Sequence, residues 1–177
     1  MWTRRHMLAL GGGGLATLAA PSLVRAGSSA VEVIEMRGTA RGERVWFAPQ
    51  GLAVAPGTTL RFINLDPGNS HTATAYHPDL LDRPRRIPEG ATPWDSGFLL
   101  PDQAFEVTLE QPGVHDFYCL PHEMAGMVGR IVVGQPDDPE WEDASEKDGD
   151  LPEPALAAFP PVEEVLAAGR IDTESPS

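Results

Sequence analysis

One stretch of ten residues, 118–127, holds the only cysteine of the chain and places an imidazole and thioethers shortly after it. Cys119, His122 and Met127 follow the spacing Cys-x2-His-x4-Met. Soft sulfur ligands select Cu(I), while imidazole suits both oxidation states of copper, so this set of donors predicts a copper-binding loop. A second imidazole must then come from elsewhere in the chain, and His71 is available.

The single cysteine excludes several other sites. A copper pair bridged by two thiolates, a four-thiolate zinc site, an iron–sulfur cluster and an internal disulfide all need more than one cysteine. The alternative is a lone buried cysteine that packs as a small hydrophobic residue, with His122 and Met127 near it by chance. The strand-like stretches Val114–Tyr118 and Val128–Val133 on either side favour the metal site, because they would hold the loop in place.

Short runs of alternating or β-branched residues, separated by Pro and Gly, predict an all-β chain that folds as a β-sandwich or barrel. These predicted strands cover residues 31–36, 44–47, 52–54, 59–64, 72–76, 104–109, 114–118 and 128–133. His71 follows the predicted turn 66–70 between two of them. A histidine after a turn is often only an exposed loop residue, so His71 needs further support as a ligand.

That support comes from a resemblance. Tyr-Cys-x-Pro-His-x3-Gly-Met-x-Gly, over Tyr118 to Gly129, resembles the ligand loop of small blue (type 1) copper proteins of the plastocyanin, amicyanin, pseudoazurin and halocyanin group. The resemblance covers about residues 31–134. It implies a cupredoxin-like Greek-key fold and one copper ion, Cu(I) or Cu(II). The residues in the ligand positions are His71, Cys119, His122 and Met127.

Two details of the loop qualify this resemblance. Met127 is preferred to Met124 as the axial ligand, because its distance along the chain from Cys119 matches the family. The family commonly has Asn directly after the first histidine, where it braces the cysteine loop, whereas this chain has Thr72. The groups that surround the ligands could therefore differ, and with them the reduction potential.

The resemblance implies a protein that shuttles single electrons between redox partners, with one edge of His122 reaching solvent. A copper carrier or storage protein without an electron-transfer role is the alternative, since the same ligands would bind copper tightly. We do not expect an enzyme. A catalytic metal keeps an open position, and His77 and His115 are the only spare imidazoles outside the predicted export signal.

The charge balance restricts the partners. The formal net charge of −13 argues against a nucleic-acid-binding protein, because phosphate contacts need clusters of Lys and Arg. Such an acidic surface favours redox partners with a cationic docking surface. We expect a monomer.

Residues 1–26 read as an export signal, with Arg4 and Arg5 before an apolar run and Val24-Arg25-Ala26 as the cleavage site. The start resembles a twin-arginine motif, which predicts a periplasmic or otherwise exported protein without stable membrane insertion after cleavage. An uncleaved anchor is the alternative, although the apolar run is shorter than the roughly 20 residues of a membrane span.

The remaining sequence divides into a cupredoxin domain over 27–134 and an acidic, Pro-rich tail over 135–177. Within the domain, 78–93 resembles an inserted loop that holds Arg83, Arg85 and Arg86, which would pair with the tail or dock an anionic partner. Few large apolar residues occur in 135–154, so we expect this part to be loosely attached. A short helix over 161–168 would pack on the barrel or on another protein.

Overall fold

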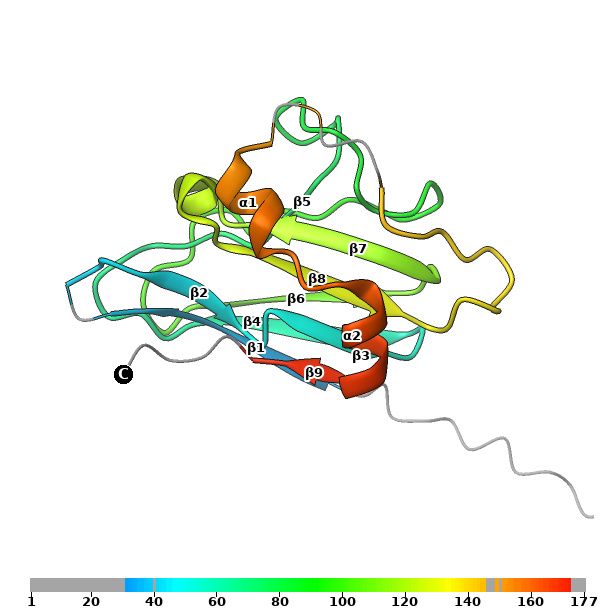
Figure 1. The fold of residues 1–177 in the computed structure, drawn as a ribbon. Helices are drawn as coiled ribbons and strands as arrows, with labels where there is room; N and C mark the ends of the chain where they lie inside the picture. The colour runs from blue at the N-terminus through cyan, green and yellow to red at the C-terminus, as the bar shows by residue number, and fades with distance from the viewer. Residues whose placement is uncertain (1–30, 40, 146–148, 150, 173–177) are drawn as a thin grey trace, which may run out of the picture.

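The computed structural model describes residues 31–39, 41–145, 149 and 151–172, which form two β-sheets packed against each other (Figure 1). The predicted export signal, residues 1–26, lies outside the described residues. Within the described residues, no helix is both long enough and apolar enough to cross a membrane.

The first sheet has the strand order β2-β1-β4-β6. Its strands are β1 (Val31–Gly38), β2 (Val45–Ala48), β4 (Thr58–Asn64) and β6 (Ala104–Leu109). β1 and β4 are parallel, and the other two pairs are antiparallel. Along β4 the side chains alternate between buried and more exposed, as expected for a strand with one face on the core.

The second sheet has the strand order β5-β7-β8-β3-β9. Its strands are β3 (Gly51–Val54), β5 (Thr74–Ala75), β7 (Gly113–Tyr118), β8 (Val128–Val133) and β9 (Arg170–Ile171). β7 and β8 form an antiparallel hairpin, and the 3-10 helix η1 (Leu120–Ala125) lies in the connection between them. This hairpin delivers the predicted copper loop to one end of the sandwich.

The core lies between the two sheets. Phe47 of β2, Phe62 of β4 and Phe117 of β7 meet edge to face, with ring centroids 4.8–6.4 Å apart. All three side chains are fully buried, and Cys119 and Met127 belong to the same cluster of buried residues. The predicted copper loop is therefore anchored in the main core rather than on a separate surface loop.

The start of the tail is attached to the sandwich at Glu142, contrary to the expectation of a loosely attached segment over 135–154, although none of residues 135–145 is buried. The backbone N–H of Val114 in β7 donates to the carbonyl of Glu142 at 2.9 Å. The Glu142 carboxylate also accepts from the N–H of Glu89 at 2.8 Å. These contacts fasten the start of the tail to both the hairpin and the inserted loop, which composition alone did not predict.

Over its described residues, the tail contains the helices α1 (Glu153–Ala158) and α2 (Val162–Ala168), and only the second was predicted. α1 lies against η1 and β8, and α2 lies against β3 (Figure 1). Val165 is fully buried, close to Gly51 of β3, so α2 packs on its own sandwich. β9 then pairs antiparallel with β3 and extends the sheet, which the sequence analysis did not predict.

The segment 77–93 has no regular strand or helix, as expected for an inserted loop. It nevertheless runs along the edge of the second sheet. The N–H of Arg86 donates to the Tyr76 carbonyl at 3.0 Å, and the N–H of Asp116 donates to the Arg86 carbonyl at 2.9 Å. Ile87 and the adjoining Trp94 are buried in the core. The loop therefore covers the edge of β7 that β5 leaves free.

Candidate metal centre

Three potential ligand atoms converge at one end of the sandwich. Cys119 Sγ lies 3.5 Å from His71 Nδ1 and 3.4 Å from His122 Nδ1. All three atoms lie within 4.8 Å of one another. His71 and Cys119 are fully buried, whereas His122 is partly exposed. The three donor atoms are close enough together for one metal ion placed between them to contact all three.

Backbone hydrogen bonds hold Cys119 and His122 in place. The N–H of His122 donates to the Cys119 carbonyl at 3.0 Å, and the N–H of Met127 donates to the His122 carbonyl at 3.2 Å. Gly126 ends η1 with a φ of 76°, and a Cβ at this position would lie 2.9 Å from the carbonyl oxygen of Pro154 in α1. Glycine is therefore required both by the turn and by the tail.

His71 reaches the same place from the connection between β4 and β5. Its N–H donates to the Leu99 carbonyl at 3.1 Å, and the N–H of Leu99 donates back to the His71 carbonyl at 2.8 Å. The ring Nε2 lies 3.0 Å from the buried carboxylate of Asp66. An ionised carboxylate only accepts hydrogen bonds, so Nε2 carries the proton and Nδ1 presents its lone pair toward Cys119.

The protonation states suit metal binding. Burial lowers the pKa of His71 and of His122, so both rings are neutral at pH 7. Burial raises the pKa of the Cys119 thiol to about 11, against opposing hydrogen bonds from Thr72 and His122. In the metal-free protein the thiol therefore keeps its proton, which a metal ion must displace on binding.

The comparisons with known proteins agree with this arrangement. Residues 34–134 match the family model of copper binding proteins, plastocyanin/azurin family. The chain belongs to this family. Its cofactor is copper, for which the site offers the nitrogen, sulfur, nitrogen donor set described above. Within the described residues, these three side chains form the one group of His, Cys, Asp and Glu donors close enough to hold a metal ion.

Individual relatives in the copper-binding family give the same result. A chloroplastic plastocyanin of Fritillaria agrestis is 33% identical over 124 residues, which cover 69% of this chain and 70% of the relative. The minor chloroplastic isoform of Arabidopsis thaliana is 34% identical over 124 residues, 68% of each chain. A pseudoazurin from Sinorhizobium is 28% identical, with a TM-score of 0.56 over 79% of this chain and 98% of that one. The predicted cupredoxin-like all-β fold is confirmed.

Met127 and Met124 have opposite environments in this cupredoxin. Met127 is fully buried in the core cluster that contains Cys119, and its carbonyl accepts from the Cys119 N–H at 3.0 Å. Met124, on η1, is 74% exposed. Only Met127 is therefore enclosed beside the thiol, although its role as the axial ligand stays a prediction.

Thr72 braces the cysteine loop. Its N–H donates to Cys119 Sγ at 3.3 Å, and its hydroxyl oxygen accepts from the N–H of Leu120 at 2.8 Å. The hydroxyl of Thr74 donates to the same oxygen at 3.0 Å. Because Thr stands here in place of the family's Asn, the groups around the ligands could have differed. The bracing contacts are nevertheless present, supplied by a shorter side chain.

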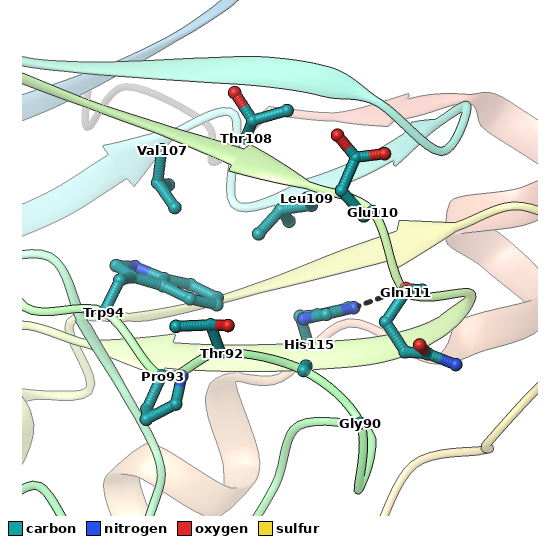
Figure 2. A pocket seen from close by; sticks show the side chains of 11 residues that line it. Gly90, Thr92, Pro93, Trp94, Val107, Thr108, Leu109, Glu110, Gln111 and His115 are labelled. Atoms are coloured by element: carbon teal, nitrogen blue, oxygen red, sulfur yellow. Dashed lines mark hydrogen bonds between the residues drawn. The ribbon is translucent and has the colours of Figure 1, made fainter.

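The spare histidines lie outside the group of ligand atoms. His77 is at the surface, where its Nδ1 accepts from the N–H of Asp79 at 3.2 Å. His115 is buried beside Trp94 and Leu109 in a cavity of about 220 Å³, and its Nε2 donates to the Gln111 carbonyl at 2.9 Å (Figure 2). The cavity is lined by none of the predicted copper ligands.

Two buried carboxylates near the ligands were not singled out from the sequence. Asp66 was assigned only to a turn, and Glu123 only to the loop. Glu123 accepts from the Tyr76 hydroxyl at 2.8 Å and forms an ion pair with Arg83 of the inserted loop. The inserted loop is thereby joined to η1, the element that carries His122. The position of Glu123 inside the ligand loop could have drawn attention to it. Its partners could not be predicted, because Tyr76 and Arg83 are far from it in the sequence.

The arginine cluster of the inserted loop was expected to pair with the acidic tail or to dock an anionic partner. Arg85 does pair with Glu142 of the tail, at 2.7 Å. Arg83 pairs instead with Glu123, and Arg86 binds Asp116 of β7 at 3.0 Å. Each of the three guanidinium groups has a carboxylate partner, so tail pairing is confirmed for Arg85 and is wrong for Arg83.

Proposed function

We propose that this protein carries single electrons between redox partners through a type 1 copper site. His71, Cys119 and His122 would hold the copper ion, and Met127 would be its fourth, weaker ligand. The observation that carries the proposal is the convergence of two imidazole nitrogens and one thiol sulfur within 4.8 Å of one another. Copper supplies the one-electron couple when bound.

The protein part of this function is to keep the ligands still. His71 is fixed by two backbone hydrogen bonds to Leu99, and Cys119 by one to Met127 and one from Thr72 to its sulfur. A ligand set held by the fold suits both oxidation states without large movement, so little reorganisation accompanies each electron. Low reorganisation supports the electron-transfer role.

Exposed apolar side chains support a docking edge at His122. Leu120 and Met124, both on η1, are 41% and 74% exposed. Phe98 and Leu100 are 59% and 57% exposed, on either side of the residue that pairs with His71. We infer that a partner docks on this apolar rim and exchanges electrons through the partly exposed imidazole. Contacts of this kind are small and short-lived.

The partner is proposed to be a redox protein with a cationic docking surface, because the chain has a formal net charge of −13. The association rate should then fall as salt is raised. The site of action is proposed to be the periplasm or another exported location, on the basis of the signal-like residues 1–26. The protein is proposed to work as a monomer and not as an enzyme.

A spectroscopic titration tests the proposal. Cu(II) added to the metal-free protein should produce an intense visible thiolate-to-copper band and a paramagnetic resonance spectrum with narrow copper hyperfine splitting. Cys119→Ser should abolish the band, and His71→Ala should change it. A wild-type protein that binds copper without this band would overturn the type 1 assignment.

A second measurement separates electron transfer from copper delivery. The proposed electron carrier should show fast electron self-exchange and should not pass its copper to a metal-free acceptor. Slow self-exchange with rapid copper transfer would instead show a copper carrier.

A further inference from the structure

Asp66 is a buried carboxylate at the back of the predicted copper site. Its side chain is 1% exposed and accepts three hydrogen bonds. Oδ1 accepts from the N–H of Gly68 at 2.8 Å, and Oδ2 accepts from Asn69 Nδ2 at 2.8 Å and from His71 Nε2 at 3.0 Å. The basic group within ion-pair distance of Asp66, among the described residues, is the imidazole of His71.

The carboxylate is held in a defined position. The N–H of Asp66 donates to Asn64 Oδ1 at 2.9 Å, and Asn64 Nδ2 donates to the Leu99 carbonyl at 2.9 Å. Gly38, at the end of β1, leaves no room on the other side, since a Cβ there would lie 1.9 Å from Asp66 Oδ2. The contacts come from three separate parts of the chain, so the carboxylate cannot turn away from His71 without disturbing them.

The hydrogen bond from His71 to Asp66 changes the donor strength of the imidazole as well as its position. A carboxylate that accepts the Nε2 proton draws negative charge into the ring and makes the opposite nitrogen a stronger donor. Its own negative charge also acts through a buried region, where screening by water is weak. Both effects favour the more positive ion, and therefore Cu(II) over Cu(I).

We propose that Asp66 is a positioning residue that lowers the reduction potential of the copper by holding an ionised carboxylate against the Nε2 proton of His71. This inference rests on the proposed function, because it requires His71 to bind copper. The alternative is that Asp66 only shapes the turn 66–70, through its hydrogen bonds to Gly68 and Asn69. The two roles predict different effects on the potential.

The matched variants are Asp66→Asn and Asn69→Ala, both studied as copper-loaded full-length protein. Asp66→Asn removes the charge with little change of shape. Asn69→Ala removes one hydrogen bond to the same carboxylate and leaves its charge and its contact with His71 in place. The measurement is the midpoint potential by spectroelectrochemistry, together with Cu(I) affinity by competition with a chromophoric chelator.

Asp66→Asn should weaken Cu(II) binding relative to Cu(I) binding about tenfold or more, as for other outer-shell partners of metal ligands. A tenfold change corresponds to a potential about 59 mV higher for a one-electron couple. Asn69→Ala should change the ratio less than about twofold. Equal potentials in the wild type and both variants, or equal shifts in both variants, would overturn the proposal.

A measurement on the wild type keeps the test valid if Asp66→Asn does not fold. In the diamagnetic Cu(I) protein, the Nε2 proton of His71 should give a downfield resonance that exchanges slowly with water. The Nε2 proton of the partly exposed His122 should exchange much faster. Equal exchange of the two protons would show that the hydrogen bond to Asp66 is absent, and the inference would fail.

The failures of the two proposals are distinguishable. A wild-type protein without the thiolate-to-copper band overturns both the type 1 site and the role of Asp66. A wild type with the band, but with a potential insensitive to the charge of Asp66, overturns the role of Asp66 alone.

Discussion

The backbone N–H of Thr72 donates a hydrogen bond to the sulfur of Cys119 at 3.3 Å, so the connection that carries His71 also holds the thiol of the later hairpin. The Thr72 hydroxyl extends this link, because it accepts from the N–H of Leu120 at 2.8 Å. The two ligand-bearing segments therefore form one hydrogen-bonded unit before any metal binds.

This unit predicts a specific effect of Thr72→Val. The substitution keeps the shape but removes the acceptor of the Leu120 N–H, and an unsatisfied polar group costs about 1–3 kcal/mol of stability. Urea unfolding of the metal-free protein should show this loss. Thr72→Ser keeps the hydroxyl and should cost clearly less. Equal losses in the two variants would show that the hydroxyl is not the source of the bracing.

Metal binding should release a proton. Because burial raises the pKa of Cys119 to about 11, the thiol is protonated at pH 8 and must lose its proton to bind a metal. Zn(II), which does not oxidise thiols, should release about one proton per ion at pH 8, measured by calorimetry in buffers of different ionisation enthalpy. The number should fall to about half a proton per ion near pH 11, where half of the thiol is already ionised. Cys119→Ser should release fewer protons at pH 8.

No release at pH 8 would mean that the cysteine is already ionised in the metal-free protein. The hydrogen bonds from Thr72 and His122 would then outweigh burial, contrary to the balance described here.

The strands and the copper loop could be predicted because their signals are local. The alternation over 104–109 corresponds to β6, Ala104–Leu109, with the same bounds. The donor spacing after Cys119 places His122 on the next turn of chain, and the strands on either side fix that loop at one end of the sandwich. His71 lies beside them in the structure, as the resemblance implied.

The tail and the outer-shell carboxylates could not be predicted because their partners are distant in sequence. The acidic composition of 135–154 gave no sign that Glu142 would bind β7 and the inserted loop. Asp is a common turn residue, so the sequence places Asp66 only in a turn. Its contact with His71 depends on how that turn packs against the second sheet. Local patterns do not determine contacts of this kind.

Met127 and Met124 offer a matched pair for the axial position. Met127→Leu should keep the visible band but raise the potential by tens of millivolts, because loss of a weak thioether ligand destabilises Cu(II) more than Cu(I). Met124→Leu should leave the potential unchanged, since Met124 is 74% exposed on η1. Spectroelectrochemistry of both variants decides the assignment. A shift only in Met124→Leu would exchange the roles of the two residues.

His115 should make the metal-free protein less stable in mild acid. Burial lowers its pKa from 6.5 to about 4, although the Gln111 carbonyl, Asp116 and Glu142 oppose the shift. The unfolded chain therefore binds a proton that the folded chain does not. This titration leaves the free energy of unfolding unchanged above pH 6.5. It lowers the free energy of unfolding as the pH falls toward 4, by up to about 3 kcal/mol.

Chemical denaturation between pH 7 and 4.5 measures this effect. The pKa values of His71 and His122 are also lowered, so the comparison of interest is between wild type and His115→Phe. The variant should lose stability less steeply with falling pH, whatever its stability at pH 7. Identical slopes would show that His115 does not titrate in this range.

Phe159 tests how firmly the tail is attached. Its ring lies 4.9 Å from the guanidinium carbon of Arg86 and 5.2 Å from that of Arg130, and meets Tyr76 edge to face. Arg86 and Arg130 both bind the buried carboxylate of Asp116. Phe159→Ala should therefore cost about 2–3 kcal/mol in urea unfolding, because it removes packing and opens this ion pair network to water.

Ala157→Ser is the control, since Ala157 is exposed on α1, the helix that ends directly before Phe159, and a surface change should stay within about 0.5 kcal/mol. If Phe159→Ala were as mild as Ala157→Ser, the contacts of Phe159 would contribute little to the attachment of the tail. A large loss would instead show that the tail is part of the fold that supports η1. The visible band of the copper-loaded variant should then also report a less ordered His122, because α1 packs directly against that element.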